Sequence, residues 1–256
     1  MNAGLKKLLY PPLGLVVTVL LWHWACVEFK ISTAVLPTPL KVLDATLQNW
    51  DLLLIEGWVT LKETLLGFIL AVGLGIPIAV AVSNSQTLNL TFTPLLIALQ
   101  SVPKVALAPI LLVWLGTGIE SKLAIAWLVA FFPIVVDTAA GLQSTPRELM
   151  ELARSLRASR WEIFAKVQFP SALPFIVTGA KVAVTLAVIG AVIGEFIGSS
   201  EGLGYVLLSA TSQFNTPLAF AALFALAALG IIAYLLVVLI EWLLSPWLPP
   251  SNERGH

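Results

Sequence analysis

Long apolar runs separated by short polar stretches dominate this chain. An α-helix needs roughly 20 apolar residues to cross the hydrocarbon core of a bilayer. Segments of about that length and character cover residues 8–27, 58–82, 90–115, 122–142, 174–197 and 217–244. Prolines at 77, 94, 103 and 109 interrupt the second and third segments, so bends are expected there. The pattern predicts an all-α integral membrane protein with about six spans, forming one domain over residues 1–256.

Two longer segments between the predicted spans also have helical periodicity. Residues 31–57 form the longest predicted outer segment, and their apolar spacing predicts a surface helix lying along the membrane. Residues 143–173 are the most polar long stretch and predict two short helices joined by a sharp turn. Thr145 and Ser159 each begin a capping-box pattern, because Glu148 and Glu162 follow three residues later.

The first of these two short helices has one apolar face. Its apolar residues recur at i, i+3, i+4 and i+7: Leu149, Leu152, Ala153 and Leu156. Three arginines flank that face: Arg154, Arg157 and Arg160. A short helix of this kind suits a groove in another protein. The alternative is a hairpin that packs on its own transmembrane bundle and has no partner.

The composition agrees with a membrane protein and excludes several other classes. Hydrophobic residues make up 59% of the chain and charged residues 11%, whereas soluble domains carry about 25% charged residues. A formal net charge of zero provides no basic surface for nucleic acid. The single cysteine, Cys26, excludes an internal disulfide.

The distribution of lysine and arginine predicts the orientation of the spans. If the N-terminus lies inside, the inner segments carry Lys6, Lys7, Arg147, Arg154, Arg157, Arg160, Lys166 and Arg254. The outer segments and span ends carry Lys30, Lys41, Lys62 and Lys122. This excess on the inner side predicts that both termini and the polar stretch 143–173 are cytoplasmic.

The polar stretch resembles the EAA loop of permeases in binding-protein-dependent ABC importers. That signature contains Glu-Ala-Ala, three residues, glycine, and then a hydrophobic stretch that closes in Leu-Pro. The matching residues here are Glu151, Ala153, Leu173 and Pro174. Leu152 replaces the first alanine, and Arg157 stands where the family usually has glycine. The segments 101–118 and 194–207 are similar to the nitrate, sulfonate, taurine and thiamine-precursor branch of these permeases.

The resemblance implies a permease subunit of the bacterial inner membrane with a type I ABC importer fold. Its cytoplasmic loop would contact an ATP-binding subunit through Glu151, Leu152, Ala153, Arg154, Leu156 and Arg157. It also implies two ATP-binding subunits, an external solute-binding protein that meets the outer segment 202–215, and a second permease copy or close relative. No P-loop pattern occurs in the chain. ATP and magnesium are therefore expected on the partner, with no cofactor in this chain.

Ionisable residues inside spans are costly, so each is a functional hypothesis. Asp137 and Lys181 lie at comparable depth, which predicts an intramembrane ion pair. Lys104 lies between two prolines, where a cation on irregular backbone suits an anionic solute. The alternatives for Lys104 are snorkelling or pairing with Glu195, and both residues are candidates for the translocation path.

Three glycines, Gly190, Gly194 and Gly198, line one face of the fifth predicted span. Such a face lets another helix approach closely, so we expect a helix–helix seam, within the chain or at a subunit interface. His23 and His256 lack ligand partners at metal-site spacing, and no catalytic constellation is present, so intrinsic enzymatic activity is not expected. The rival hypothesis is a proton-coupled secondary transporter that uses Asp137, Lys181 and Glu195 as a relay.

Overall fold

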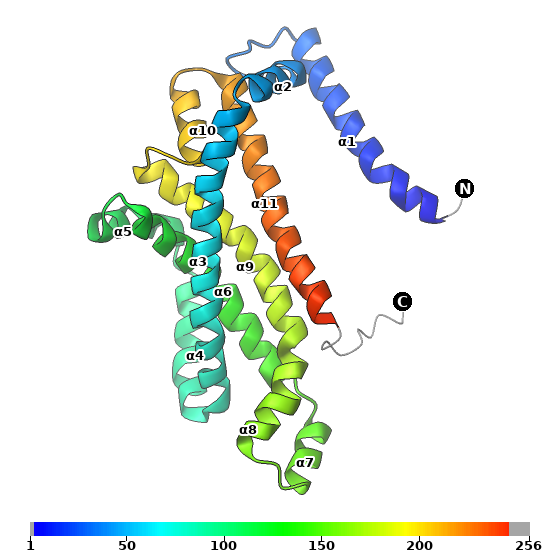
Figure 1. The fold of residues 1–256 in the computed structure, drawn as a ribbon, viewed down its shortest axis with the longest axis vertical. Coiled ribbons are helices and arrows are strands. Elements are labelled where there is room, and N and C mark those ends of the chain that lie inside the picture. The colour runs from blue at the N-terminus through cyan, green and yellow to red at the C-terminus, as the bar shows by residue number, and fades with distance from the viewer. Residues whose placement is uncertain (1–2, 246–256) are drawn as a thin grey trace.

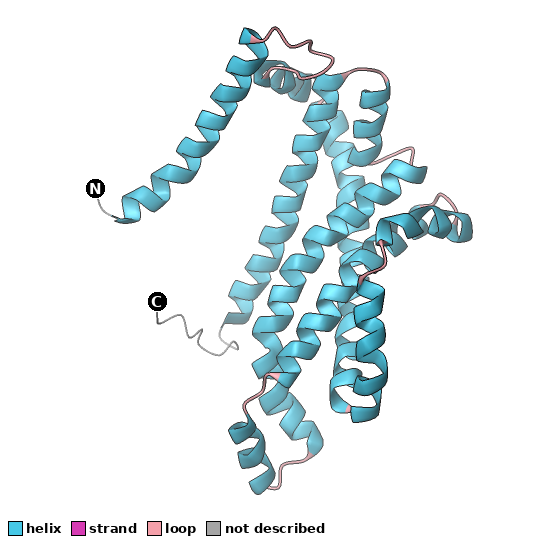
Figure 2. Ribbon diagram, turned by 180° about the vertical axis from the view of Figure 1, so that it is seen from behind, coloured by secondary structure: helices cyan, strands magenta, loops and turns pink. Residues whose placement is uncertain are grey.

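The structure is a computed structural model that describes residues 3–245, with the backbone alone at residues 3–9, 11, 93 and 97. Every regular element in this part of the chain is helical, and short loops connect the helices (Figure 2). In chain order the elements are α1 (Ala3–Glu28), α2 (Pro39–Gln48), α3 (Trp50–Asn84), α4 (Gln86–Gln100), η1 (Lys104–Leu107), α5 (Ala108–Leu115), α6 (Ile119–Gln143), α7 (Arg147–Ser155), α8 (Arg160–Ile163), η2 (Phe164–Gln168), α9 (Phe169–Gly198), α10 (Leu203–Ser212) and α11 (Thr216–Leu244).

Four helical segments of the described chain are long and apolar enough to cross a membrane: α3, α6, the continuous stretch Arg160–Gly198, and α11. Together, α4, η1 and α5 make a fifth if they are counted as one span, although they bend by 86°. Pro103 has an extended backbone at the end of α4, which places the break among the predicted prolines. The predicted span 8–27 lies within α1, a helix of 26 residues whose described apolar part is Pro12–Glu28.

The core forms where α6 lies between α3 and α9. Gly67 of α3 and Gly190 of α9 approach Ala126 of α6 from two sides. A Cβ atom at Gly67 would lie 2.5 Å from the Ala126 Cβ, and one at Gly190 would lie 2.6 Å from the Ala126 Cα. Any larger side chain at either position would separate the helices, so glycine is required for this packing.

The two ends of the bundle carry different short helices (Figure 1). At one end lie α2 and α10, and α2 together with the first turns of α3 accounts for the predicted outer segment 31–57. At the opposite end α7 and α8 form the predicted hairpin. α1 extends away from the bundle, and its inward contact includes the Trp22 ring, 6.0 Å from the rings of Phe220 and Phe224.

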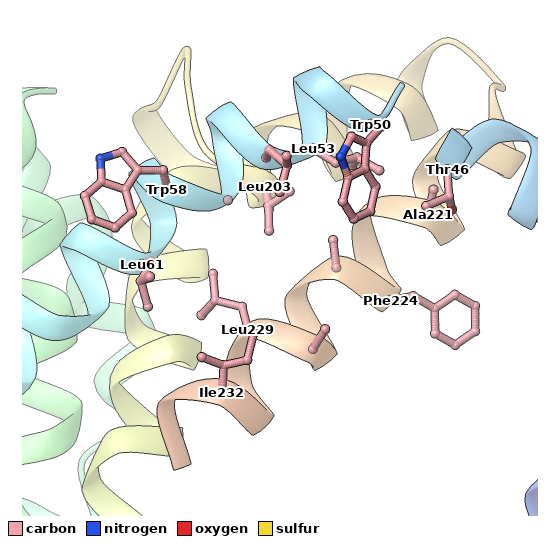
Figure 3. A pocket seen from close by; sticks show the side chains of 14 residues that line it. Thr46, Trp50, Leu53, Trp58, Leu61, Leu203, Ala221, Phe224, Leu229 and Ile232 are labelled. Atoms are coloured by element: carbon pink, nitrogen blue, oxygen red, sulfur yellow. The ribbon is translucent and has the colours of Figure 1, made fainter. Parts of the chain in front are cut away.

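An apolar pocket of about 460 Å³ opens between α3 and α11 near α2. Figure 3 shows Trp50 and Trp58 on α3 and Leu229 and Ile232 on α11 around this space. Apart from the hydroxyl of Thr46 and the two indole rings, the lining is hydrocarbon. The pocket therefore offers no cluster of polar groups that could hold a polar solute, and the candidate functional residues lie elsewhere.

Candidate functional site

The hairpin formed by α7 and α8 exposes the predicted apolar stripe. Leu149, Leu152 and Leu156 are 45%, 56% and 73% exposed. Met150 and Ala153 are half-buried on the side of α7 that faces the rest of the chain. Large apolar side chains that lie exposed on one helical face are a typical contact surface for a partner protein. The three exposed leucines form the apolar stripe. Ala153 was predicted on the same face, but it turns inward and packs within the chain.

The turn after α7 keeps the conformation of a glycine turn without a glycine. Arg157 has a φ angle of +54°, in the left-handed region. Its backbone N–H donates to the Arg154 carbonyl at 2.9 Å, and that of Ala158 donates to the Ala153 carbonyl at 3.0 Å. These two bonds form a Schellman motif, in which glycine is the usual left-handed residue. Arg157 therefore fulfils the geometric role of the glycine in the EAA signature, at the cost of local backbone strain.

The two predicted helix starts have different outcomes. At α8 the Ser159 hydroxyl accepts from the Glu162 backbone, and the Ser159 backbone N–H donates to the Glu162 carboxylate at 2.9 Å, so this capping box is confirmed. The box predicted at Thr145 is wrong. The Thr145 hydroxyl donates to the Leu142 carbonyl, and Pro146 occupies the N-cap position of α7.

At the opposite end, buried side chains of α3 and α9 bind the N-terminus of α10. The backbone N–H of Leu203 donates to Thr60 Oγ1 at 2.9 Å, and that of Gly204 donates to Glu195 Oε2 at 2.6 Å. Thr60 in turn donates to Glu195 Oε1 at 2.6 Å. The Gly202 N–H donates to the carboxylate of Glu56, also on α3. The first backbone amides of a helix have no partner within the helix. At α10, two of these donors bind acceptors on α3, more than 100 residues earlier in the chain.

A buried ion pair lies beside this network. Lys122 of α6 is 4% exposed, and its Nζ lies 3.3 Å from Glu63 Oε1 on α3 and 3.8 Å from Glu201 Oε1. The sequence pattern predicted Lys122 at an outer span end and did not point to Glu63. The available signal was an acid inside the apolar run 58–82, because an isolated carboxylate in a span needs a partner.

The two candidate residues for a translocation path are not neighbours. Glu195 is 1% exposed and bonded to Thr60 and α10, so it is not available to line an open path in this structure. Lys104 is half-exposed at the break between α4 and α5. Its Nζ lies 3.2 Å from the Gln100 carbonyl and 4.7 Å above the ring of Phe132. Lys104 and Glu195 therefore do not form the ion pair that was the predicted alternative.

The predicted ion pair between Asp137 and Lys181 is also wrong. Lys181 Nζ lies 2.6 Å from Glu241 Oε2 on α11. Asp137 of α6 instead faces Gly179 of α9, where an added Cβ would lie 2.8 Å from the Asp137 Cβ. Residues two apart on a helix point in nearly opposite directions. Gly179 consequently faces α6 while Lys181 faces α11, so equal depth did not bring Asp137 and Lys181 together.

The three glycines of α9 lie against helices of the same chain. Gly190 and Gly194 face Ala126 and Lys122 of α6, and Gly198 faces Leu112 of α5. The seam is therefore an internal one, and these contacts leave no room for a second subunit on that face. His23 lies on α1, His256 lies outside the described residues, and no group of three or more metal-ligating side chains occurs in the described part.

Residues 71–246 match a protein family described as binding-protein-dependent transport system inner membrane component. The chain is 34% identical to a probable ABC transporter permease protein of Haemophilus influenzae, over 93% of this chain and 96% of the relative. It is 38% identical to the formylaminopyrimidine transport permease protein ThiX of Halalkalibacterium halodurans, over 83% of this chain and 85% of the relative.

A solved structure has a similar fold. A chain from an inward-facing form of the MetNI methionine ABC transporter superposes with a TM-score of 0.66 and 22% sequence identity. The match covers 75% of this chain and 95% of that chain. At this level of identity the likeness concerns the arrangement of helices, which confirms the predicted type of fold.

We expect the Arg157→Gly variant to stabilise the hairpin. Glycine adopts a positive φ angle without the Cβ clash that costs another residue roughly 1 kcal/mol, although its larger freedom in the unfolded chain offsets part of the gain. Hydrogen exchange of the α7 amides should become slower. The control is Arg154→Gly within the helix, which should speed exchange because glycine costs about 1 kcal/mol there. Faster exchange in Arg157→Gly would contradict the strained-turn interpretation.

We expect the Glu195→Ala variant to loosen the N-terminus of α10. It leaves the buried Gly204 amide without its acceptor, and an unpaired buried donor costs about 1–3 kcal/mol. Hydrogen exchange over residues 203–212 should become faster than in the unmodified chain. The matched control is Glu201→Ala, because the Glu201 side chain is 58% exposed. Equal exchange in both variants would show that Glu195 does not hold α10.

Proposed function

This chain belongs to the family of inner membrane components of binding-protein-dependent transport systems, and from that membership we propose how it works as the permease subunit of an ABC importer. It is a multi-pass membrane protein that forms the translocation path for a small polar solute. An external binding protein delivers the solute, and ATP hydrolysis on a separate subunit drives transport. The observation that carries the coupling proposal is the exposed apolar stripe on the projecting α7 helix.

The stripe is the proposed contact for the ATP-binding subunit. Leu152 and Leu156 would enter a groove of that subunit, and Glu151 at the edge of the stripe would form polar contacts. The excess of lysine and arginine in the segments on this side supports a cytoplasmic hairpin and an N-in, C-in orientation. Residues 31–57 and α10, at the opposite end, would then face the binding protein.

The complete importer in this proposal contains two ATP-binding subunits and two permease chains. The second permease is another copy of this chain or a close relative. Nucleotide and magnesium bind to the ATP-binding subunits, and this chain contributes transport without chemistry of its own. Binding of ATP would bring the two hairpins together and rock the spans between inward- and outward-facing forms.

The proposed solutes are those of the related branch: nitrate, a sulfonate such as taurine, or a pyrimidine precursor of thiamine. The relative named for formylaminopyrimidine transport supports the pyrimidine class. Lys104 supports an anionic or strongly polar group on the solute, because its ammonium is half-exposed on broken backbone beside an aromatic ring. Lys104 is accordingly the residue that we place on the path.

The rival proton-coupled mechanism has weaker support. Its three relay residues lie in separate contacts: Asp137 against Gly179, Lys181 on Glu241 and Glu195 on the α10 amides. A relay needs neighbouring groups that can exchange a proton, and this arrangement does not bring these three together.

We expect Leu152→Asp and Glu151→Lys to abolish solute uptake and to release the ATP-binding subunit during co-purification in detergent. Leu152→Asp places a charge in the centre of an apolar contact, and Glu151→Lys reverses a charge at its edge. The measurements are uptake into cells and the amount of ATP-binding subunit recovered with the tagged permease.

The control for these variants is Ala165→Asp, which places the same charge at an exposed position of η2, directly after the hairpin. It should retain both uptake and co-purification. Recovery of the ATP-binding subunit at normal levels with Leu152→Asp would exclude the stripe as the docking surface. A wild-type permease that purifies alone, and takes up solute with a proton gradient in place of ATP, would favour the rival mechanism.

We expect Lys104→Ala to raise the solute concentration needed for half-maximal uptake by roughly tenfold, the size of one hydrogen bond to a charged group. The ATP-binding subunit should still co-purify, because Lys104 is remote from the stripe. Lys104→Arg keeps the positive charge, so it should raise this solute concentration less than Lys104→Ala does. Uptake kinetics of Lys104→Ala that equal those of the wild type would exclude Lys104 from the path.

A further inference from the structure

A second cavity lies behind the hairpin, on the side away from the proposed contact with the ATP-binding subunit. It has a volume of about 840 Å³ and separates α7 and α8 from the end of α3. Its lining residues are Val80, Ser83, Asn84, Met150, Arg154, Ala158, Arg160, Trp161, Ile163, Phe164 and Gln168. Arg154 lies about 160° around α7 from Leu152. Arg154 was predicted to contact the ATP-binding subunit together with the stripe, whereas in the structure it lines this cavity.

The described lining of the cavity carries positively charged hydrogen-bond donors and no carboxylate. None of its described lining residues is acidic, and neither Arg154 nor Arg160 is among the residues that form ion pairs in the described part of the chain. The Ser83 hydroxyl is buried without a hydrogen-bond partner in the structure. Two guanidinium groups fit a ligand with several anionic oxygens, because arginine binds phosphate with paired hydrogen bonds.

The position of the cavity indicates where that phosphate comes from. Ser83 and Asn84 end the membrane-spanning helix α3, and Gln168 directly precedes α9. The Trp161 ring beside them is 71% exposed, as is typical of aromatic residues at the boundary between bilayer and water. Val80 and Phe164 continue the lining on its apolar side. The cavity therefore has charged groups at headgroup level and apolar groups toward the hydrocarbon.

We propose that this cavity binds the phosphate headgroup of an anionic phospholipid, such as phosphatidylglycerol, with Arg154 and Arg160 as its ligands. Basic pockets between helix ends on the cytoplasmic side are suited to such headgroups. The inference rests on the proposed cytoplasmic orientation of the hairpin. The bound lipid would fix the rear of the hairpin and leave the apolar stripe free for the ATP-binding subunit.

Native mass spectrometry of the full-length chain in detergent tests this proposal. Phosphatidylglycerol should bind as one tight lipid per chain, and phosphatidylcholine, which has no net charge, at least roughly tenfold more weakly. Arg160→Gln should weaken phosphatidylglycerol binding by roughly tenfold through the loss of a charged hydrogen bond. Arg160→Lys keeps the charge without the paired hydrogen bonds, so it should weaken phosphatidylglycerol binding less than Arg160→Gln does.

The matched control is Arg147→Gln at the start of α7, which removes the same charge outside the cavity. It should bind phosphatidylglycerol like the unmodified chain. Equal weakening by Arg147→Gln and Arg160→Gln, or equal affinity for the two lipids, would overturn the proposal. Displacement of the lipid by millimolar inorganic phosphate would assign the cavity to a free anion and also overturn it. The assay contains no ATP-binding subunit, so its failure leaves the co-purification test of the coupling function unaffected.

Discussion

The close contact of three helices at Ala126 is the constraint on which the rest of the structure depends. Apolar side chains gain little by leaving lipid for protein, so helices in a membrane associate mainly through tight backbone packing. Gly67 of α3 and Gly190 of α9 both provide this packing against Ala126 of α6. Thr60 lies about two turns from Gly67 on α3, and Glu195 lies more than one turn beyond Gly190 on α9. The contact at Ala126 therefore also fixes the two side chains that bind α10.

Polar groups inside this bundle are stable because each belongs to a connected set. Glu195 accepts from Thr60 and from the amide of Gly204, where the positive end of the α10 dipole favours a carboxylate. Lys122 lies in the same region and forms ion pairs with Glu63 and Glu201. In low dielectric an isolated charge would be very costly, whereas hydrogen bonds and opposite charges offset that cost. The end of the molecule that carries α10 is thus held by polar contacts, and the centre of the bundle by small residues.

Sequence patterns predicted the features that depend on one helix and missed those that depend on how two helices face each other. Hydropathy located the spans because the bilayer imposes a length, and Ser159 was recognised because a cap is local. The Asp137–Lys181 prediction failed because depth says nothing about the direction of a side chain around its helix. Arg157 stands where the EAA signature usually has glycine, and the sequence did not predict the conformation of this turn. In the structure, the Schellman hydrogen bonds hold the left-handed backbone with arginine in place.

The hairpin gains its proposed role from having two different faces on one short helix. Leu152 and Leu156 are exposed on one side of α7, while Arg154 lines the cavity on the other. A force applied to the stripe acts on a rigid unit, because the turn at Arg157 and the capping box at Ser159 satisfy the backbone between α7 and α8. η2 then joins α8 to α9 without a loop. This continuous helix leads from the hairpin to Gly190, so displacement of the hairpin would reach the three-helix contact at Ala126 directly.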